Sequence, residues 1–378
     1  MKRYPAYDPP EYVDWQPDIE VMKCYKQTLL ANEARWRIIE KLSVKQLLDI
    51  YAGLLRQRLH DIALKRWVKL GVISKAWLGT GEEAVTIGCV HALDRSRCTD
   101  GTPVDFVSPM IRNAGACHEM GMSLADMLRG YLATADSPTK GRDLHIGSLR
   151  DGVIAPISHL GDITAVSNGI ALSFKLRREK RLILTWIGDG TTKAGVTHEA
   201  LNFAAVNRLP IIFVIQNNQV ALGTKLETYH KGNFADWPSS YGIYGATFDG
   251  NNVLDAYAAT ALAAEIVRSG RGPALLVAET FRMGGHATHD ETEARRLFPK
   301  EVFEYWAKRD PIGCYEQYLI ENYDLAGETL PEKQDSNRRV LAALEEQIVT
   351  EIEQAVEEAL ASRRIPIRPE SAVEGVYV

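Results

Sequence analysis

The sequence has few cysteines, and no part of it resembles a membrane segment. The five cysteines, Cys24, Cys89, Cys98, Cys117 and Cys314, are odd in number and far apart, with no Cys-x-x-Cys pair. This pattern argues against a disulfide framework or a structural zinc site, so we expect a reducing, cytoplasmic location. No apolar run approaches the roughly 20 residues that span a bilayer. The N-terminus lacks the apolar core of a signal peptide, so we expect no membrane partner.

An excess of positive charge is also missing. The 378 residues carry a formal net charge of −5, whereas a nucleic-acid-binding surface normally needs a basic excess. The one basic run, KLRREKR at 175–181, is typical of the solvated end of a helix. We therefore expect no nucleic-acid partner. The apolar fraction of 46% is that of an ordinary globular protein with a large core.

The length alone allows two or three domains, and the patterns divide the chain into three parts. Residues 1–42 form an N-terminal arm whose first 20 residues, rich in proline and aromatics, are expected to run extended. Residues 43–330 form the main domain, which begins with a helix at 43–70 capped by Ser43. Residues 331–378 hold a charged helix at about 336–361 and a tail. Two long loops are expected at 133–161 and 282–300.

Between residues 163 and 281, helices and strands alternate. The periodicity predicts helices at 164–178, 196–207 and 252–268, and strands at 181–188, 210–216, 245–250 and 273–281. The strands are continuous apolar runs, which indicates a parallel sheet covered on both faces. The predicted fold class is therefore α/β, with a doubly wound, mostly parallel sheet and helical extensions at both ends.

A carboxylate stands in a glycine-rich turn at the end of the first of these buried strands. Asp189 lies between Gly188 and Gly190, and Asn218 follows the next strand 29 residues later, about one strand–helix–strand crossover. Ligands of such sheets bind beyond the carboxyl ends of the strands. A carboxylate and an amide there suit magnesium that also binds a substrate phosphate. Each motif taken alone could be a plain tight turn.

Other phosphate-binding loops fit less well. The turn lacks the Gly-x-x-x-x-Gly-Lys-Ser/Thr pattern of a P-loop. It also departs from the Gly-x-Gly-x-x-Gly pattern of dinucleotide-binding folds, because Lys193 occupies the position of the third glycine. The sequence does not show whether Lys193 faces a cofactor, a partner chain or solvent.

The whole segment GDGTTKAGVTHEALNFAAVNRLPIIFVIQNN resembles the thiamine-diphosphate motif, which begins Gly-Asp-Gly and ends Asn-Asn. From about residue 45 onward the chain is similar to the alpha subunit of the decarboxylating component of 2-oxo acid dehydrogenase complexes. WLGTGEEAVTIG (77–88), GRDLHIGS (141–148), DPIGCYEQYL (310–319) and the terminal VEGVYV carry the wider match. The resemblance implies a thiamine-diphosphate-binding fold with thiamine diphosphate and magnesium as cofactors.

The resemblance also implies roles for particular residues. The metal would be held by the side chains of Asp189 and Asn218 and by the backbone carbonyl of Val220. The remaining cofactor-binding positions would be Arg112, Ser158, Leu160, Gly188, Gly190 and His286. Arg112 offers a planar fork of donors for the diphosphate, and Leu160 would support the bent cofactor.

His286 is the candidate acid–base residue, since histidine exchanges protons near neutral pH. His289, three residues later, allows a rival His-x-x-His metal pair, and two exposed loop histidines are a third interpretation. The chain departs from the family pattern at Ile111, where a tyrosine is usual, and at Gln216, where some members carry an arginine. His145 matches a histidine of part of the family, but its role stays open.

The resemblance implies that the chain is an enzyme subunit acting with partners. The carboxylate that contacts the aminopyrimidine would come from a beta subunit, so an alpha-2 beta-2 heterotetramer is expected. A lipoyl-bearing acyltransferase core would accept the acyl group from the 2-oxo acid. A branched-chain 2-oxo acid is the narrow preference, with pyruvate and acetoin dehydrogenases as alternatives. A non-catalytic scaffold subunit with the same fold is a second class of hypothesis.

Overall fold

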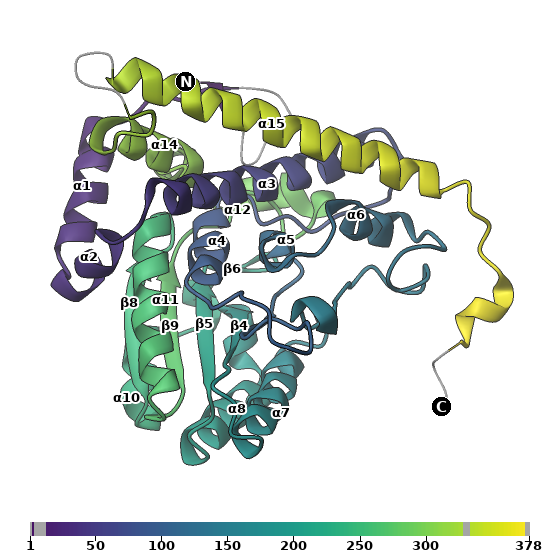
Figure 1. The fold of residues 1–378 in the computed structure, drawn as a ribbon, viewed down its shortest axis with the longest axis horizontal. Coiled ribbons are helices and arrows are strands. Elements are labelled where there is room, and N and C mark those ends of the chain that lie inside the picture. Colours follow the sequence, from purple (N-terminus) through teal and green to yellow (C-terminus); the bar gives the residue numbers. More distant parts are fainter. Residues whose placement is uncertain (1, 4–12, 328–332, 375–378) are drawn as a thin grey trace.

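A five-stranded parallel sheet forms the centre of the fold (Figure 1). We describe it in a computed structural model that covers residues 2–3, 13–327 and 333–374. The strand order is β3-β4-β5-β9-β8, and all neighbouring pairs are parallel. The strands are β3 (Phe106–Ser108), β4 (Ile183–Gly188), β5 (Ile211–Asn217), β9 (Ala274–Glu279) and β8 (Tyr244–Asp249). The sequence predicted all but β3, which has three residues and is too short to show a pattern.

Helices cover both faces of the sheet, which confirms the α/β prediction. Side chains of β5 alternate between the two sides: Ile212 and Val214 belong to one core, and Ile211 and Phe213 to the other. Helices α4 (Glu83–His91) and α11 (Val253–Arg268) pack on the first side. Helices α7 (Asp162–Leu176) and α8 (Gly195–Val206) pack on the second. Burial on both faces explains why β4, β5 and β9 read as unbroken apolar runs, whereas the edge strand β8, in which only Phe248 is buried, does not.

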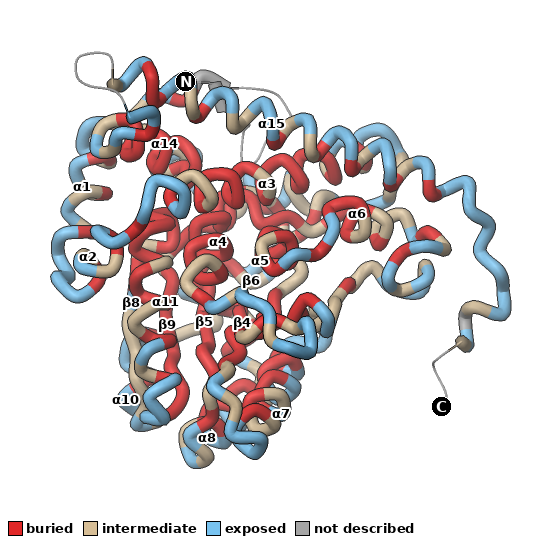
Figure 2. The backbone as a smooth tube through the Cα atoms, in the orientation of Figure 1, coloured by how far each residue is buried: buried red, intermediate tan, exposed pale blue. Residues whose placement is uncertain are grey.

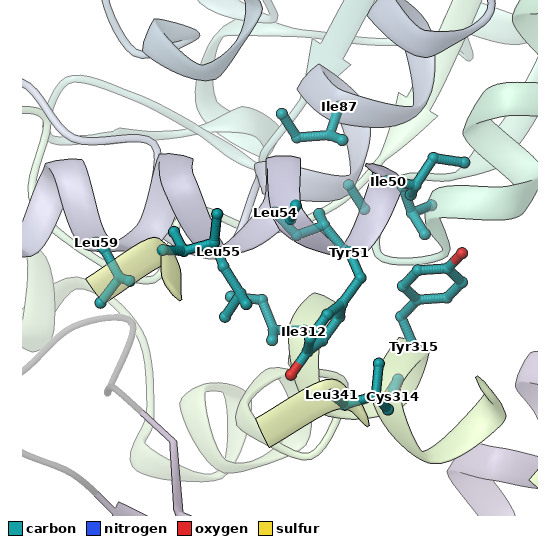
Figure 3. Close-up of a cluster of buried hydrophobic side chains, with 14 of the residues drawn as sticks. Ile50, Tyr51, Leu54, Leu55, Leu59, Ile87, Ile312, Cys314, Tyr315 and Leu341 are labelled. Carbon is teal, nitrogen blue, oxygen red and sulfur yellow. The ribbon is translucent and has the colours of Figure 1, made fainter. Parts of the chain in front are cut away.

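A layer of helices lies over one end of this sheet domain. It consists of α1 (Ile19–Leu30), α2 (Glu33–Ile39), α3 (Val44–Lys69), α14 (Pro311–Asn322) and α15 (Lys333–Ser362). Figure 3 shows part of its core, to which Tyr51 of α3, Ile312 of α14 and Leu341 of α15 contribute, together with Ile87 of α4. Ser43 caps α3 as predicted, in a capping box with Gln46.

The remaining elements are short. They are β1 (Lys2–Arg3), β2 (Val13–Asp14), β6 (Val220–Ala221), β7 (Thr224–Lys225), α5 (Ala114–Met120), α6 (Leu124–Leu132), α9 (Leu226–Tyr229), α10 (Trp237–Tyr241), α12 (Glu291–Leu297) and α13 (Lys300–Ala307). Single 3-10 turns lie at Leu149–Asp151, Gly190–Lys193, Phe234–Asp236, Thr288–Asp290 and Pro369–Ala372.

One of the two predicted loops is wrong. The segment 282–300 contains a 3-10 turn and the helix α12, of which only Ala294 is buried. With a single buried position the helix has no apolar period to detect, although its Glu and Arg residues favour helix. The loop at 133–161 is confirmed, since it holds only the turn at Leu149–Asp151.

Among the described residues of the predicted N-terminal arm, only the short strands β1 and β2 are extended, and helices follow from Ile19 onward. Strand β2 leads into the buried Trp15, and α1 begins at Ile19. Residues 4–12, the predicted boundary at 330 and most of the terminal VEGVYV lie outside the described residues. The division at 42 and 330 stays a prediction.

Figure 2 shows buried residues gathered in the sheet and in α3, α4 and α11. None of the described helices is long and apolar enough to cross a membrane.

Candidate active site

The carboxyl ends of β4 and β5 bring the two motif residues to one edge of the sheet. Gly188 of β4 pairs with Gln216 of β5 in parallel register, and each strand ends within one residue of that pair. Asp189 and Asn218 directly follow the two strand ends. Their position beside each other is therefore a consequence of the crossover length predicted from sequence.

Asp189 is almost fully buried, with an exposed fraction of 1%. Its Oδ1 accepts a hydrogen bond of 2.7 Å from the backbone N–H of Gly190. Its Oδ2 makes no hydrogen bond of regular geometry with a described residue, although the hydroxyl of Tyr229 lies near enough to interact with it. Burial raises the pKa of Asp189, and burial with the charge of Asp189 raises the pKa of Tyr229. An unpaired buried carboxylate oxygen is costly unless a ligand completes it.

A cavity of about 440 Å³ opens at this edge. Strand-end residues form one wall, a second comes from the loop before α5, a third from the loop 133–161 and a fourth from the segment after β9. The cavity is lined by every predicted site residue except Asn218, namely Arg112, Ser158, Leu160, Gly188, Asp189, Gly190, Val220 and His286. Leu160 is 64% exposed at this cavity.

Asn218 is not among the residues that line the cavity, and the buried carboxylate of Glu82 holds its amide. Asn218 Nδ2 donates to Glu82 Oε1 at 2.9 Å, and its Oδ1 accepts from the backbone N–H of Val220 at 3.3 Å. Glu82 Oε1 also accepts from Gln216 Nε2 at 2.6 Å. Arg112 Nε lies 3.4 Å from Glu82 Oε2. Glu82 therefore joins the strand end of β5 to the arginine of the cavity.

Positive charge gathers opposite Asp189. Arg282 is buried, and its guanidinium donates to the carbonyls of Leu222 at 2.6 Å and Gly284 at 3.1 Å. Burial, with a further contribution from Arg112, lowers the pKa of Arg282 to about 10. Burial and the charges of Arg112 and Arg282 lower the pKa of His286 to about 4. His286 is therefore a neutral imidazole at pH 7.

His145 acquires a defined environment in the structure. Its Nδ1 lies 2.7 Å from Asp143 Oδ1, and its Nε2 lies 3.0 Å from Ser158 Oγ. The carboxylate accepts from Nδ1–H and so orients the ring, which leaves Nε2 to interact with Ser158. Both His145 and Ser158 line the cavity.

Lys193 and His289 do not line the cavity. Lys193 Nζ lies 2.8 Å from His230 Nδ1 and over the rings of Phe234 and Trp237. The side chain thus packs on an aromatic cluster beside the site. His289 is exposed. No group of three His, Cys, Asp or Glu side chains that could hold a metal occurs in the described part of the chain, which gives the His-x-x-His alternative no support.

The residues present fit a magnesium–diphosphate group. Asp189, Asn218 and the Val220 carbonyl are hard oxygen donors, and Asp189 Oδ2 is unpaired. A Cβ added at Gly188 would meet nothing closer than Met110 Sδ at 3.8 Å and would enter the cavity, so the glycine leaves space there. Arg112 and Arg282 supply positive charge.

Sequence reasoning missed Glu82, Arg282 and Tyr229. Glu82 contacts a residue 136 positions away, so no local pattern contains the pair. Arg282 carried a detectable signal, because a charged side chain immediately after a buried strand is positioned at the ligand-binding edge. Tyr229 lies on α9, a single turn too short to show periodicity.

Comparison with known proteins places these features in context. A family model described as "Dehydrogenase E1 component" matches residues 54–365. The 2-oxoisovalerate dehydrogenase subunit alpha of Bacillus subtilis is 29% identical over 89% of this chain and 96% of its own length. The pyruvate dehydrogenase E1 component subunit alpha of Acholeplasma laidlawii is 30% identical over 79% of this chain and 85% of its own. The alpha subunit of acetoin:2,6-dichlorophenolindophenol oxidoreductase of Bacillus subtilis is 32% identical over 65% and 72%.

Proposed function

The chain belongs to the dehydrogenase E1 component family of oxidoreductases, and on this premise we propose the way in which it works. It is the alpha subunit of a 2-oxo acid dehydrogenase, and it binds thiamine diphosphate through magnesium at the strand-end edge. It acts with a beta subunit in an alpha-2 beta-2 heterotetramer, and a lipoyl-bearing acyltransferase receives the acyl group. The observation that carries the proposal is the buried Asp189, whose Oδ2 has no hydrogen bond of regular geometry and which lines a cavity together with Arg112 and Arg282. Asn218 follows the neighbouring strand end.

The residues predicted from the sequence each have a physical task in this proposal. Asp189, Asn218 and the Val220 carbonyl hold the metal, and Arg112 orients the diphosphate through charge-assisted hydrogen bonds. Gly188 and Gly190 let the backbone approach the diphosphate. When bound, the cofactor supplies the electron sink that decarboxylation of a 2-oxo acid requires.

His286 moves the proton in this scheme. Its pKa of about 4 keeps the imidazole neutral but weakly basic at pH 7, because it is buried and faces the charges of Arg112 and Arg282. An anionic diphosphate beside these two arginines would offset their charge and so raise the pKa of His286 toward the neutral range. Leu160 supports the cofactor from the apolar side of the cavity. Ser158, held by His145, presents a hydroxyl at the same cavity.

For the substrate we propose a branched-chain 2-oxo acid, with pyruvate and acetoin as the alternatives. The 2-oxoisovalerate dehydrogenase relative matches the largest share of this chain among the three relatives above. The three identities lie between 29% and 32% and do not separate the substrates. The non-catalytic scaffold hypothesis has less support, because Arg112, Asp189 and His286 surround one cavity.

The test is turnover by the assembled enzyme. The chain is co-expressed with a beta subunit from its own genome, and 2-oxo-acid-dependent dye reduction is measured with thiamine diphosphate and magnesium. We expect turnover on branched 2-oxo acids. Turnover on pyruvate or acetoin alone would overturn the substrate assignment, and no turnover on any of these together with no cofactor binding would overturn the function.

A further inference from the structure

The sequence offers no reason to connect Glu82 with the cofactor site, yet its carboxylate is fully buried there. It lies at the N-terminal end of α4 and contacts three residues at this edge of the sheet, of which Arg112 also lines the cavity. These are Asn218 after β5, Gln216 within β5 and Arg112 before α5. A buried carboxylate is stable only when it is paired, and Glu82 is paired entirely with residues of this site.

Glu82 determines which way the amide of Asn218 faces. A carboxylate only accepts hydrogen bonds, so Asn218 must present its NH2 group to Glu82. The carbonyl oxygen Oδ1 is then turned away, with the Val220 N–H at 3.3 Å as its hydrogen-bond donor. Without Glu82, the amide could reverse and present a donor where a metal needs an oxygen.

The same carboxylate holds Arg112. The two oxygens of Glu82 have different partners. Oε1 accepts hydrogen bonds from the side-chain amides of Gln216 and Asn218, and Oε2 lies 3.4 Å from Nε of Arg112. The neighbouring Glu83 stabilises the turn before α4, because its Oε2 accepts a hydrogen bond of 2.9 Å from the backbone N–H of Gly81. Glu82 therefore occupies a set position between the metal side and the diphosphate side of the cavity.

We propose that Glu82 is a positioning residue, which orients the Asn218 amide toward the metal and the Arg112 guanidinium toward the diphosphate. This inference rests on the proposed function, because it assumes that both ligands bind here. Residues that orient metal ligands typically contribute about 10- to 100-fold to metal affinity.

The experiment measures both ligands on the complex of this chain with its beta subunit. Mn²⁺ replaces Mg²⁺, and free Mn²⁺ is counted by its electron paramagnetic resonance signal at saturating thiamine diphosphate. The Kd of thiamine diphosphate is measured separately at saturating Mn²⁺. Thermal unfolding of each variant reports whether the fold is kept.

Two substitutions separate the two tasks of Glu82. Glu82→Leu removes both oxygens, so the Mn²⁺ Kd should rise at least about tenfold. Glu82→Gln keeps one oxygen that can accept from Asn218 and Gln216, but it places an NH2 group against Arg112. It should leave the Mn²⁺ Kd within about threefold and raise the thiamine diphosphate Kd by about tenfold, a split that a merely structural role would not produce.

Glu119→Gln is the matched control. The carboxylate of Glu119 is also largely buried, and it is paired with His91 at 2.7 Å and with Arg56 at 3.1 Å. Glu119 does not line the cavity. Its variant should bind both ligands as the wild type does. Unchanged Mn²⁺ affinity in Glu82→Leu, or equal losses of both ligands in Glu82→Gln, would overturn the inference alone. If Glu82→Leu does not fold, the split in Glu82→Gln decides. A wild-type complex that binds neither ligand would overturn the proposed function as well.

Discussion

Glu82 and Glu83 are neighbours in the sequence and equally buried, but they belong to two different clusters of charge. Glu83 pairs with the Arg58 guanidinium, which also donates to Asp310 at 3.0 Å and so ties α3 and α4 to the start of α14. We call Arg58, Glu83 and Asp310 the structural cluster. Glu82 belongs instead to the strand-end cluster, which consists of Glu82, Arg112, Asp189 and Asn218.

The two clusters differ in whether their oxygen atoms are satisfied. In the structural cluster, Glu83 Oε2 accepts from Gly81 N–H, and Asp310 Oδ1 caps α14 through the N–H groups of Ile312 and Gly313. In the strand-end cluster, Asp189 Oδ2 makes no hydrogen bond of regular geometry with a described residue. A complete set of partners stabilises the fold, whereas an incomplete one leaves room for a ligand.

The largest expected effect is on stability and comes from the structural cluster. Arg58→Met leaves Glu83 and Asp310 buried without their cation, so the free energy of unfolding should fall by about 3–5 kcal/mol. Urea denaturation measures this change. Lys45→Met, which breaks the exposed pair between Lys45 and Asp49, is the control and should change stability by about 0.5 kcal/mol or less. Equal effects of the two substitutions would contradict the structural role.

The second effect is on binding and comes from the strand-end cluster. Asp189→Ala removes the unpaired carboxylate, so magnesium-dependent binding of thiamine diphosphate should weaken by about 100-fold or more without unfolding the chain. Calorimetric titration of the complex with the beta subunit measures this. Asp249→Ala, which removes a half-buried aspartate outside the cavity, should leave the affinity unchanged. Unchanged affinity in Asp189→Ala would refute its assignment as a ligand.

The two glycines that flank Asp189 separate an effect on cofactor binding from an effect on stability. Gly188→Ala adds a methyl group that enters the cavity, with the nearest atom 3.8 Å away, so the fold should persist while cofactor affinity falls by about tenfold. Gly190→Ala brings its Cβ to 2.6 Å from Ala221 Cβ, which should destabilise the chain by about 1–3 kcal/mol. Thermal unfolding and cofactor titration of both variants separate the two results. A reversed outcome would contradict the assignment of Gly188 to the cofactor cavity and of Gly190 to the contact with Ala221.

A smaller effect concerns the proton at His286. Burial and two arginines lower the pKa of His286 to about 4, so Arg112→Ala should raise it toward the ordinary value of 6.5. Because the pKa of His286 is lower in the folded chain than in the unfolded chain, the unfolded chain takes up the proton first as the pH falls. The free energy of unfolding therefore keeps its full value, as far as His286 is concerned, above pH 6.5 and decreases as the pH falls toward 4. Nuclear magnetic resonance titration of the His286 ring follows the change, and an unaltered pKa in Arg112→Ala would contradict the electrostatic coupling.

The smallest expected effect lies in the backbone beside the site. Leu222 has a φ of 52° and is 59% exposed, so Leu222→Gly should stabilise the chain by about 0.5 kcal/mol by removing left-handed strain. Leu149 is similarly exposed but is not in the left-handed region, so Leu149→Gly should destabilise. Urea denaturation of the pair is the measurement. Loss of stability in both would show that the backbone at Leu222 is not strained.

The sequence predicted the parts of the fold and site that depend on local patterns. Continuous apolar runs predicted β4, β5 and β9, and a short strand pattern before a turn predicted β8. The spacing of Asp189 and Asn218 predicted that they follow neighbouring strand ends. The sequence could not predict the contact of Glu82 with Asn218, because that contact depends on the packing of α4 against the strand ends. It also missed α12, whose single buried residue leaves no apolar stripe.

The central claim is that the strand-end cluster binds the diphosphate through a metal. The most direct measurement is calorimetric titration of thiamine diphosphate into the wild-type complex with its beta subunit, with magnesium and then with a chelator. We predict tight binding with magnesium and a large loss of affinity without it. The reason is that the negatively charged carboxylate of Asp189, without a metal ion, repels the diphosphate. Equal affinity under both conditions would contradict the account.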